Sequence, residues 1–426
     1  MDSTPEYDVV IVGGGMAGAA LACALGRADW RVALVDPAPP APWTAAPAQA
    51  SLTPEDFDRR VVALTRASEE FLRSLGAWDD MAKQRISPYQ GMYVWDADGT
   101  AHIEFQAAEL YEPSLGHIIE NRIVTGALWN QLRQLPVQVI PQKVTGFSHL
   151  GGPVQLTLGD GSALLSKLVV AADGAESPLR RLAAFPTREW DYEQHGLVAT
   201  VVTEKPHEKT AWQRFLSEGP LAFLPLNGAG DRYSSIVWST TPERARELLA
   251  MPDEAFCEAL GEALEQRLGS VVEVSRRQAI PLRQRHAKHY VKPGIALVAD
   301  AAHTIHPLAG QGINLGFLDV AVLADELLRA RERGIDFADL SVLQRFQRRR
   351  MGHNLATMAA MEGFKRLFGA DPLPLRWMRN TGMRWLNEQG WLKNQIAALA
   401  LAQDMLPKRW LRDETLEKPQ ATELAH

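Results

Sequence analysis

A glycine-rich turn near the N-terminus constrains the fold of this chain more than any other feature. Residues 7–36 read YDVVIVGGGMAGAALACALGRADWRVALVD, in which Gly13-x-Gly15-x-x-Gly18 separates two apolar runs. The first run, Val9 to Val12, is continuously apolar, as in a strand that is covered on both faces. Small and apolar residues typical of a helix follow the glycines. The chain is therefore predicted to open with a strand, a tight turn, a helix and a parallel strand.

This turn has the spacing and the context of an adenine-dinucleotide fingerprint. Glycines permit close approach of a pyrophosphate, the following helix offers its N-terminal N–H groups, and Asp36 ends the second strand, where an acid binds a ribose hydroxyl. An acid here disfavours a 2′-phosphate, which leaves NAD or FAD. Because the chain has a single such fingerprint, either NAD is the sole cofactor or FAD is bound and a nicotinamide visits transiently.

Length, charge and cysteine content exclude several classes of protein. At 426 residues the chain is long enough for two or three domains. A net charge of -6 gives no general basic surface, so nucleic acid is not an expected partner. Cys23 and Cys257 form no CxxC motif, which fits a reducing cytoplasm. No basic leader and no run of about 18 apolar residues predict a membrane span, although peripheral contact with the inner face of the membrane stays open.

The patterns after the first unit predict an α/β chain with an inserted, largely antiparallel sheet. The strand-like runs GLVATVVTE, LAFLPL and YSSIVWST supply that sheet, and a helical stretch over 241–268 follows them. Alternating runs around Asp98-Gly99 and Asp160-Gly161 predict two hairpins. A Rossmann-like cofactor-binding domain is assigned to 1–80, 114–185 and 286–345. The substrate domain is assigned to 81–113 and 186–285. The C-terminal helical region is 346–426.

Two later segments place an aspartate directly after a buried strand. LVVAADGAESPLRRL contains Asp173, and ALVADAAHTIHPLAGQGINLGFLDVAVLADELL contains Asp300, His303 and His306. A metal site on the last three lacks a fourth ligand, and a serine-type triad lacks the GxSxG elbow. The two histidines are interpreted as loop-supporting rather than catalytic residues. Asp300 is the stronger candidate, because ligands bind where strands of such a sheet end.

Together with GGGMAG, these segments resemble the three-part signature of the group A flavoprotein monooxygenases, which have the p-hydroxybenzoate hydroxylase fold. The order and spacing match over nearly the whole chain. The strings DAAHTIHPLAGQGINLGFLDVAVLADEL, RRVVALTRAS, IIENRIVTGAL and GPLAFLPL are further similar to the ubiquinone-biosynthesis hydroxylase family. Two departures add a methyl group near the cofactor: Ala299 precedes Asp300 where the family has Gly-Asp, and Ala171 begins a segment that is usually Gly-Ala-Asp-Gly.

The resemblance implies that FAD is the bound cofactor and that its adenosine and phosphate end meets the first half of the chain. Arg60 and Arg122 would contact phosphate or the flavin edge, and Asp173 the pyrophosphate region. The residues that would hold the adenosine end are Gly13, Gly15, Gly18 and Asp36.

The flavin end of FAD is assigned by the resemblance to the third segment. Asp300 would bind the ribitol, and Pro307 would lie beside the isoalloxazine. Gly310, Gly312 and Asn314 would present backbone N–H groups to it. A helix that begins near Gly312 would stabilise negative charge on the reduced ring, so no acid or base from the protein is needed for oxygen activation, and the catalytic residues stay unassigned.

The implied activity is hydroxylation of the aromatic ring of a polyprenylated phenol or benzoquinol on the route to ubiquinone. NADH or NADPH and O2 would be consumed through a flavin C4a-hydroperoxide. A halogenase of this fold is disfavoured because its WxWxIP string is absent, and a geranylgeranyl reductase would use no oxygen. A catalytically silent flavin-binding assembly protein is the alternative from another class. Association with a membrane, a biosynthetic complex or a second copy stays open, and so does the role of the Trp-rich C-terminal segment.

Overall fold

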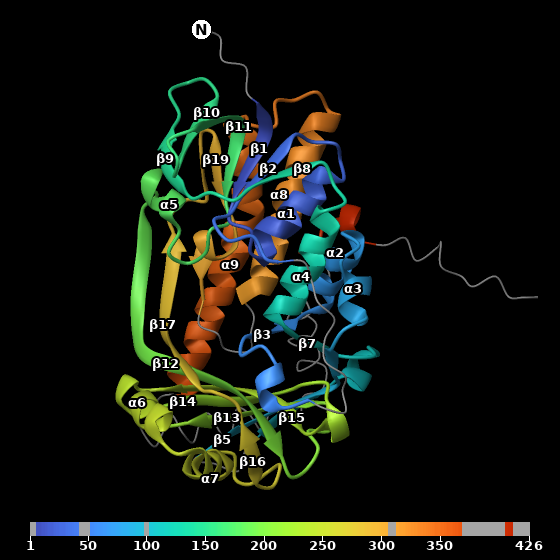
Figure 1. The fold of residues 1–426 in the computed structure, drawn as a ribbon, viewed down its shortest axis with the longest axis vertical. Helices are drawn as coiled ribbons and strands as arrows, with labels where there is room; N and C mark the ends of the chain where they lie inside the picture. Colours follow the sequence, from blue (N-terminus) through green and yellow to red (C-terminus); the bar gives the residue numbers. More distant parts are fainter. Residues whose placement is uncertain (1–5, 42–51, 98–101, 306–311, 369–404, 412–426) are drawn as a thin grey trace, which may run out of the picture.

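The structure is a computed structural model that describes residues 6–41, 52–97, 102–305, 312–368 and 405–411. Within these residues the fold rests on three sheets of eight, nine and three strands. In Figure 1 the eight-stranded sheet and its helices form the upper part of the molecule, and the nine-stranded sheet forms the lower part. The α/β architecture predicted from the sequence is confirmed.

The eight-stranded sheet has a parallel centre with the order β19-β11-β1-β2-β8. Strands β18, β9 and β10 add antiparallel pairs at its margins. The predicted hairpin around Asp160-Gly161 is confirmed as the pair β10 and β11. The strands are β1 (Tyr7–Val12), β2 (Val32–Val35), β8 (Val137–Ile140), β9 (Val144–Ser148), β10 (Val154–Leu158), β11 (Ala163–Ala171), β18 (Val291–Lys292) and β19 (Ile295–Leu297).

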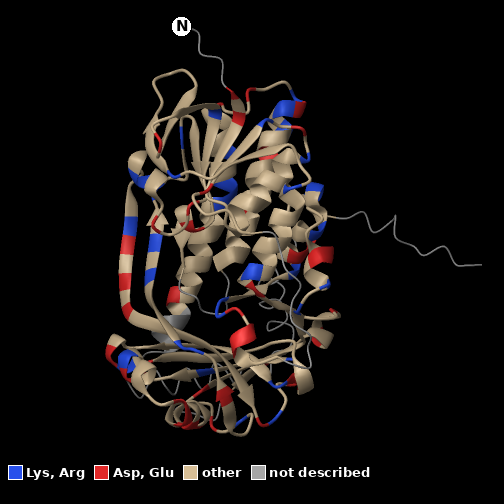
Figure 2. Cartoon of the chain, viewed as in Figure 1, with Lys and Arg blue, Asp and Glu red and all other residues tan. Residues whose placement is uncertain are grey.

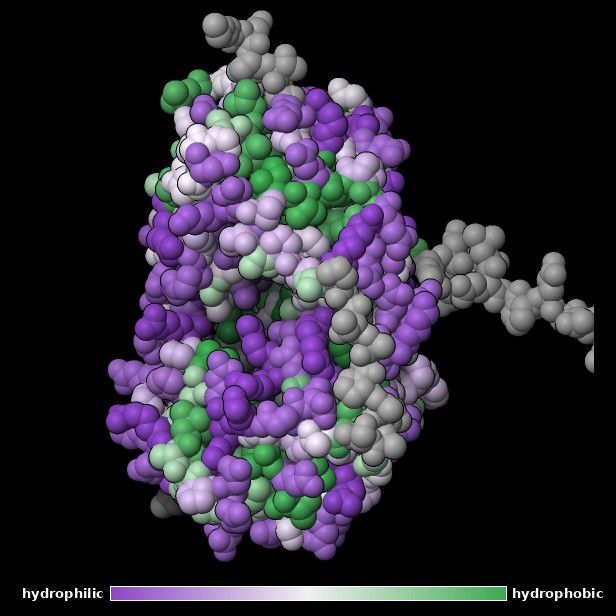
Figure 3. All heavy atoms as spheres, in the orientation of Figure 1, coloured by the Kyte–Doolittle hydropathy of each residue, from purple (hydrophilic) through white to green (hydrophobic). Residues whose placement is uncertain are grey.

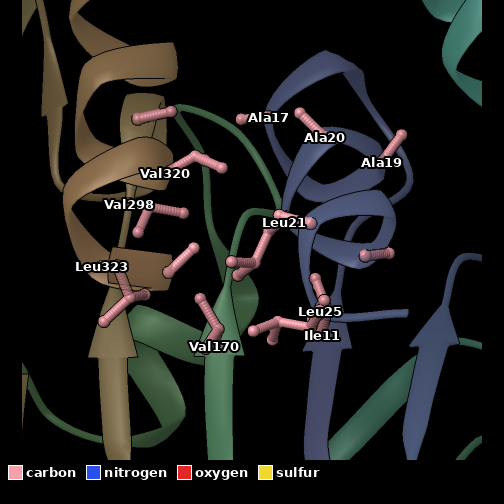
Figure 4. Close-up of a cluster of buried hydrophobic side chains, with 14 of the residues drawn as sticks. Ile11, Ala17, Ala19, Ala20, Leu21, Leu25, Val170, Val298, Val320 and Leu323 are labelled. Atoms are coloured by element: carbon pink, nitrogen blue, oxygen red, sulfur yellow. The ribbon is translucent and has the colours of Figure 1, made fainter. Parts of the chain in front are cut away.

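Helices α1 (Met16–Gly26), α4 (Asn121–Leu132) and α8 (Gly312–Glu332) pack together beside this sheet. The small residues of α1 let it lie close to both neighbours, and every residue from Ala17 to Gly26 is buried. Figure 4 shows side chains of α1, α8 and the strands meeting in one apolar cluster, with Leu21 at its centre. This packing fixes the N-termini of α1 and α8 at the carboxyl edge of the parallel strands.

The nine-stranded sheet has the order β20-β17-β12-β15-β14-β13-β5-β6, with β16 also paired to β12. All its pairs are antiparallel except β13 with β5. The strands are β5 (Gly91–Asp96), β6 (His102–Gln106), β12 (Thr187–Thr203), β13 (Thr210–Leu216), β14 (Gly219–Pro225), β15 (Tyr233–Thr240), β16 (Val271–Val274), β17 (Gln278–Ala287) and β20 (His303–Thr304).

One face of this sheet is covered by α7 (Asp253–Ala263) and by Leu248 of α6 (Pro242–Ala250). Phe256 and Leu260 of α7 pack against alternate residues of the central strands, among them Phe223 and Trp238. The opposite face points toward the upper part of the molecule. The predicted helical stretch over 241–268 is confirmed, with a break at Pro252 between the two helices.

The long strands β12 and β17 form a ribbon that joins the two parts of the molecule (Figure 1). In Figure 2 the acidic residues of the ribbon lie mostly on β12 and the basic residues on β17, and Arg285 binds Glu189 across the pair. Strand β20 pairs with β17 through Arg285 and Thr304. The segment that follows β19 is therefore attached directly to the lower sheet.

A three-stranded sheet and short helices complete the described structure. The sheet has the order β3-β7-β4.

Long helix α9 packs against α8. The predicted domain limits stay a prediction, and the Trp-rich segment lies outside the described residues. The remaining elements are β3 (Val61–Leu64), β4 (Ile86–Tyr89), β7 (Gly116–Glu120), α2 (Arg66–Ser74), α3 (Trp78–Ala82), α5 (Pro178–Leu182), α9 (Leu340–Phe368), and the 3₁₀ helices Pro54–Asp56, Ala107–Leu110, Ala229–Asp231, Ala299–Ala301 and Lys408–Trp410.

Candidate functional site

Two glycines of the turn between β1 and α1 lie against backbone atoms that leave no room for a side chain. Gly13 has φ +103°, and its N–H donates to the carbonyl of Val35 at 2.8 Å. A Cβ at Gly13 would lie 2.4 Å from the carbonyl oxygen of Ala172, and one at Gly18 would lie 1.9 Å from that of Gly13. These two glycines therefore serve the tight packing of the turn on β1 and β11.

Gly15 has a different environment from the other two glycines of the motif. A Cβ at this position would meet nothing within 4 Å, and Gly15 lines a cavity. Gly15 is also the N-cap residue of α1, and no side chain caps the first N–H groups of that helix. The positive end of α1 thus opens onto the cavity, as an anion site requires.

Asp36 lies on the other side of the same turn. Its carboxylate accepts hydrogen bonds from Gly14 N at 2.6 Å and from Ala38 N at 2.8 Å. The Nε1 of Trp129 donates to the carbonyl of Gly14 at 2.8 Å. The acid of the fingerprint is therefore joined to the turn itself, although Asp36 is not among the described residues that line the cavity.

The second turn of the site follows β19 and contains Asp300. Ala299 has φ +51°, which is uncommon for a residue other than glycine, and the Thr304 hydroxyl donates to the Asp300 carbonyl at 3.3 Å. Asp300 lines the cavity, and its surface is accessible from that open space although protein surrounds it. Burial raises the pKa of its carboxyl, and the charges of His303 and Arg60 partly offset this effect. Arg60 lines the same cavity.

The N-terminus of α8 forms a third wall of the site. Gly312 and the residue after it line the cavity. Asn314 is buried and connects the first turn of α8 to two other elements. Its Oδ1 accepts from Thr65 N at 3.0 Å and from Ser68 Oγ at 2.7 Å, and its Nδ2 donates to Ala63 O at 2.8 Å. The side chain of Asn314 thus anchors the helix whose N-terminus faces the cavity.

The cavity itself has a volume of about 640 Å³ and extends from the glycine turn to the exposed face of the nine-stranded sheet. Gly15, Asp300 and Gly312 lie at one end, and residues of β12, β13, β14 and β15 form the other. Figure 3 shows the surface hollowed between the upper and lower parts of the molecule. One continuous space therefore joins the dinucleotide motif to a second, largely apolar wall.

A buried polar network holds the Asp300 turn in place. Asp319 of α8 is completely buried, and its carboxylate accepts from His303 Nε2 at 2.5 Å, Ala299 N at 3.1 Å, Arg350 Nε at 2.8 Å and Asn354 Nδ2 at 3.0 Å. Burial raises the pKa of this carboxyl, but the His303 and Arg350 charges and the hydrogen bonds outweigh burial and hold it well below its usual range. Helices α8 and α9 thus fix the turn jointly.

Comparison with known proteins assigns this architecture. Residues 6–353 match the model of an FAD binding domain family. The 3-demethoxyubiquinol 3-hydroxylase of Escherichia coli (strain K12) is 39% identical over 396 residues, which cover 92% of this chain and 98% of that protein. The chain belongs to the FAD-dependent hydroxylases of ubiquinone biosynthesis. Ubiquinone biosynthesis monooxygenase COQ6 of Xenopus tropicalis, 36% identical over 92% of this chain and 93% of its own length, is another member.

Solved structures confirm the fold of this hydroxylase. The p-nitrophenol 4-monooxygenase of Pseudomonas putida DLL-E4 superimposes with a TM-score of 0.73 at 19% identity, covering 94% of this chain and 99% of that one. A probable FAD-dependent monooxygenase of Pseudomonas aeruginosa gives 0.72 at 22% identity, covering 88% and 99%. The p-hydroxybenzoate hydroxylase fold expected from the sequence is thereby confirmed.

The described residues of the hydroxylase fit FAD. The uncapped N-terminus of α1, with no Cβ at Gly15, suits a pyrophosphate. Asp300 lines the cavity and offers a carboxylate to hydroxyl groups, and the N-terminus of α8 faces the same space. The remaining cavity volume extends toward the lower sheet, where a substrate has room.

Two of the predicted cofactor residues of the hydroxylase have their side chains engaged elsewhere. Arg122 binds Glu120 at 2.9 Å and the carbonyl of Asp56, and it does not line the cavity. One oxygen of Asp173 caps α5 by accepting from Leu179 N at 3.0 Å, while the other is buried without a partner among the described residues. Burial raises the pKa of the Asp173 carboxyl. Contacts of both residues with FAD stay a prediction.

The position of His303 bears on whether this residue acts on a ligand in the cavity or supports the loop that contains Asp300. This side chain is 1% exposed and contacts Asp319 rather than the cavity, as expected of a loop-supporting residue. Among the described residues, no group of three His, Cys, Asp or Glu side chains is placed to hold a metal ion. His306, Pro307 and Gly310 lie outside the described residues.

Several supporting residues were missed at the level of sequence. Asp319, Arg350 and Asn354 lie on α8 and α9 and form the network described above. Arg180, buried in α5, donates to the carbonyls of Ala301 at 2.9 Å and Ala175 at 2.7 Å and so links the second motif to the third. The one available signal was an aspartate within the apolar stretch NLGFLDVAVLA, because a buried charge requires partners.

Proposed function

We propose that this chain hydroxylates the aromatic ring of a polyprenylated phenol or benzoquinol intermediate of ubiquinone biosynthesis. The names of its relatives support a ubiquinol-type substrate, since they include a 3-demethoxyubiquinol 3-hydroxylase. The observation that carries the proposal is the continuous cavity from Gly15 and Asp300 to the wall of the lower sheet. A cofactor at one end and an aromatic ring at the other would meet inside the protein.

The proposed reaction uses NADH or NADPH as a transient reductant. Ring C–H, O2, NAD(P)H and a proton give ring C–OH, water and NAD(P)+. Bound FAD supplies the two-electron reduction of O2 that this balance requires. The single dinucleotide fingerprint supports a nicotinamide that visits and leaves, since the chain has no second motif of this kind to hold it.

The residues of the chain contribute binding, orientation and exclusion of water. The N-termini of α1 and α8 and the carboxylate of Asp300 hold the cofactor end. Apolar side chains of the sheet wall, such as Val237 and Leu224, keep water away from the ring. A dry and preorganised site protects a reactive oxygen species from side reactions.

Lipid analysis of a strain that lacks this chain tests the proposal. We expect loss of ubiquinone and accumulation of a prenylated precursor that lacks one ring oxygen, both reversed by a plasmid copy. Unchanged ubiquinone in the deletion strain would reject the proposal. If the chain were a reductase of this fold, its deletion would instead change the saturation of a prenyl chain. If it were a catalytically silent assembly protein, the plasmid copy would restore ubiquinone, but the purified chain would consume no oxygen.

A polyprenylated substrate lies in a lipid bilayer, so we further propose peripheral contact with the inner face of the membrane. Within the described residues, no helix has both the length and the apolar character needed to cross a bilayer. Flotation of the full-length protein with liposomes of bacterial phospholipid should carry it to the top of the gradient. Failure to co-migrate would count against membrane contact but not against hydroxylation.

A further inference from the structure

The wall of the cavity that faces the cofactor end is one face of the nine-stranded sheet. Val198, Ala222, Leu224 and Val237 make most of it apolar. Residues at the intervening positions, such as Leu197 and Trp238, point to the opposite face and pack under α7. Because side chains alternate along a strand, the cavity face is set by every second residue of β12 to β15.

Three polar side chains of β13 and β15 interrupt this apolar wall: Gln213, Ser235 and Ser239. Gln213 of β13 is 7% exposed and lines the cavity. Ser235 of β15 is fully buried, and its hydroxyl has no partner among the described residues. Polar groups buried in an apolar wall destabilise the fold unless they are hydrogen-bonded. Gln213 and Ser235 both line the cavity, so a ligand in that cavity can supply a hydrogen-bond partner to each.

The sheet register fixes the relation between these two groups. Gln213 pairs with Ala222, which pairs with Val237, so the three lie in one row across β13, β14 and β15. Ser235 lies two residues along β15 from this row. Two strand spacings give roughly 10 Å between β13 and β15, and two residues give about 7 Å along the strand. A single hydroxyl group of a ligand cannot reach both Gln213 and Ser235 across this separation. An aromatic ring that lies over Ala222 and carries oxygen atoms on opposite sides can reach both.

We propose that Gln213 and Ser235 hydrogen-bond the oxygen substituents of the substrate ring and thereby select the carbon that is hydroxylated. This inference rests on the proposed function and deepens it. The small side chain of Ala222 leaves room for the ring, and the apolar residues around it favour the unsubstituted edge and the start of a prenyl chain. Regiochemistry is then set by the sheet, while oxygen is delivered from the cofactor end.

The test uses the FAD-loaded enzyme, NADH or NADPH, and a geranylated methoxyphenol as probe. Gln213→Met keeps the length of the side chain and removes the amide, and Ser235→Ala removes the hydroxyl. Ser234→Ala is the matched control, because Ser234 is also fully buried with an unpartnered hydroxyl but does not line the cavity. FAD content and melting temperature report whether each variant is folded.

Three quantities are measured for each variant. The change in FAD absorbance gives the dissociation constant of the probe. Product analysis gives the fraction of oxidised NAD(P)H that yields hydroxylated product and the ring position of the new hydroxyl group. Loss of one hydrogen bond should raise the dissociation constant about tenfold in Gln213→Met and Ser235→Ala. The coupled fraction should fall, and a second product isomer should appear. Ser234→Ala should match the wild type in all three.

Wild-type values for binding, coupling and product position in both cavity variants would overturn the inference while leaving the proposed function intact. If the wild-type enzyme binds the probe but forms no product, the proposed function is rejected. The dissociation constants of the variants relative to the wild type would still test the roles of Gln213 and Ser235 in binding. Absence of binding by the wild type would contradict both.

Discussion

The two turns that meet at the cavity are stabilised in opposite ways. The glycine turn after β1 depends on close backbone contacts, with Gly18 pressed against the carbonyl of Gly13. The turn after β19 is held by side chains, through the buried carboxylate of Asp319 and its partners on α9. Both turns follow parallel strands and present cavity-lining residues at the same edge of the sheet. A binding turn can therefore be fixed by its own backbone contacts or by side chains of distant helices. We expect different substitutions to destabilise the two turns.

The largest effect is expected from Gly18→Ala, because the new Cβ would lie 1.9 Å from a backbone oxygen that cannot move without breaking the turn. Overpacking of this kind costs about 3 kcal/mol or more. Gly15→Ala is the matched control. Its Cβ points into open space, so urea unfolding should match the wild type while FAD content falls. Equal unfolding midpoints for Gly18→Ala and the wild type would refute the packing account of the first turn.

The second turn should fail through charge rather than through packing. Asp319→Asn leaves Arg350 and His303 without their buried carboxylate, which we expect to lower the free energy of unfolding by about 3–5 kcal/mol. FAD content should fall as well, because the Asp300 turn loses its support. Asp8→Asn breaks the more exposed ion pair with Arg31 and should cost about 1 kcal/mol or less. Similar losses in the two variants would contradict the distinction.

The sequence predicted the first turn well and the support of the second turn poorly. Gly13, Gly15, Gly18 and Asp36 form a local motif, so their arrangement follows from spacing alone. Nothing in the local pattern shows that Asp319 meets Asn354, which is 35 residues further along the chain. The pairing of Gln213 with Ala222 and Ala222 with Val237 likewise depends on strand register. Predictions based on local spacing therefore locate a cofactor turn but not the long-range contacts that hold a turn or shape a wall.

A smaller effect is expected from pH, because buried histidines lie close to the second turn. Burial and the charge of His303 lower the pKa of His286 from 6.5 to about 4. The unfolded chain therefore binds more protons than the folded chain between these values. The contribution to stability is present above pH 6.5 and is lost as the pH falls toward 4.

His286→Gln removes this titration and keeps a hydrogen-bonding group beside Tyr290. Urea midpoints at pH 7.0 and 4.5 should differ less in the variant than in the wild type. A difference should remain, because burial and Arg350 also lower the pKa of His353 to about 4. Identical pH dependence in variant and wild type would show that His286 titrates normally in the folded protein.

The smallest effect is expected from Ala299→Gly. Relief of the left-handed backbone at φ +51° favours glycine by about 1 kcal/mol, and loss of a buried methyl group disfavours it by about 0.8 kcal/mol. The free energy of unfolding should therefore stay within about 1 kcal/mol of the wild type, with FAD content unchanged. A loss larger than about 2 kcal/mol would mean that packing of the buried Ala299 methyl group stabilises the turn more than backbone strain destabilises it.

Isotope incorporation tests most directly whether the cavity joins a flavin to a phenolic ring. Purified enzyme loaded with FAD is supplied with NADH or NADPH, a geranylated methoxyphenol and ¹⁸O2, and the product is analysed by mass spectrometry. The account predicts one ¹⁸O atom in each product molecule, bound to a ring carbon, and oxidation that speeds up when the phenol is added. Product without ¹⁸O, or NAD(P)H oxidation with no ring hydroxylation at all, would contradict it.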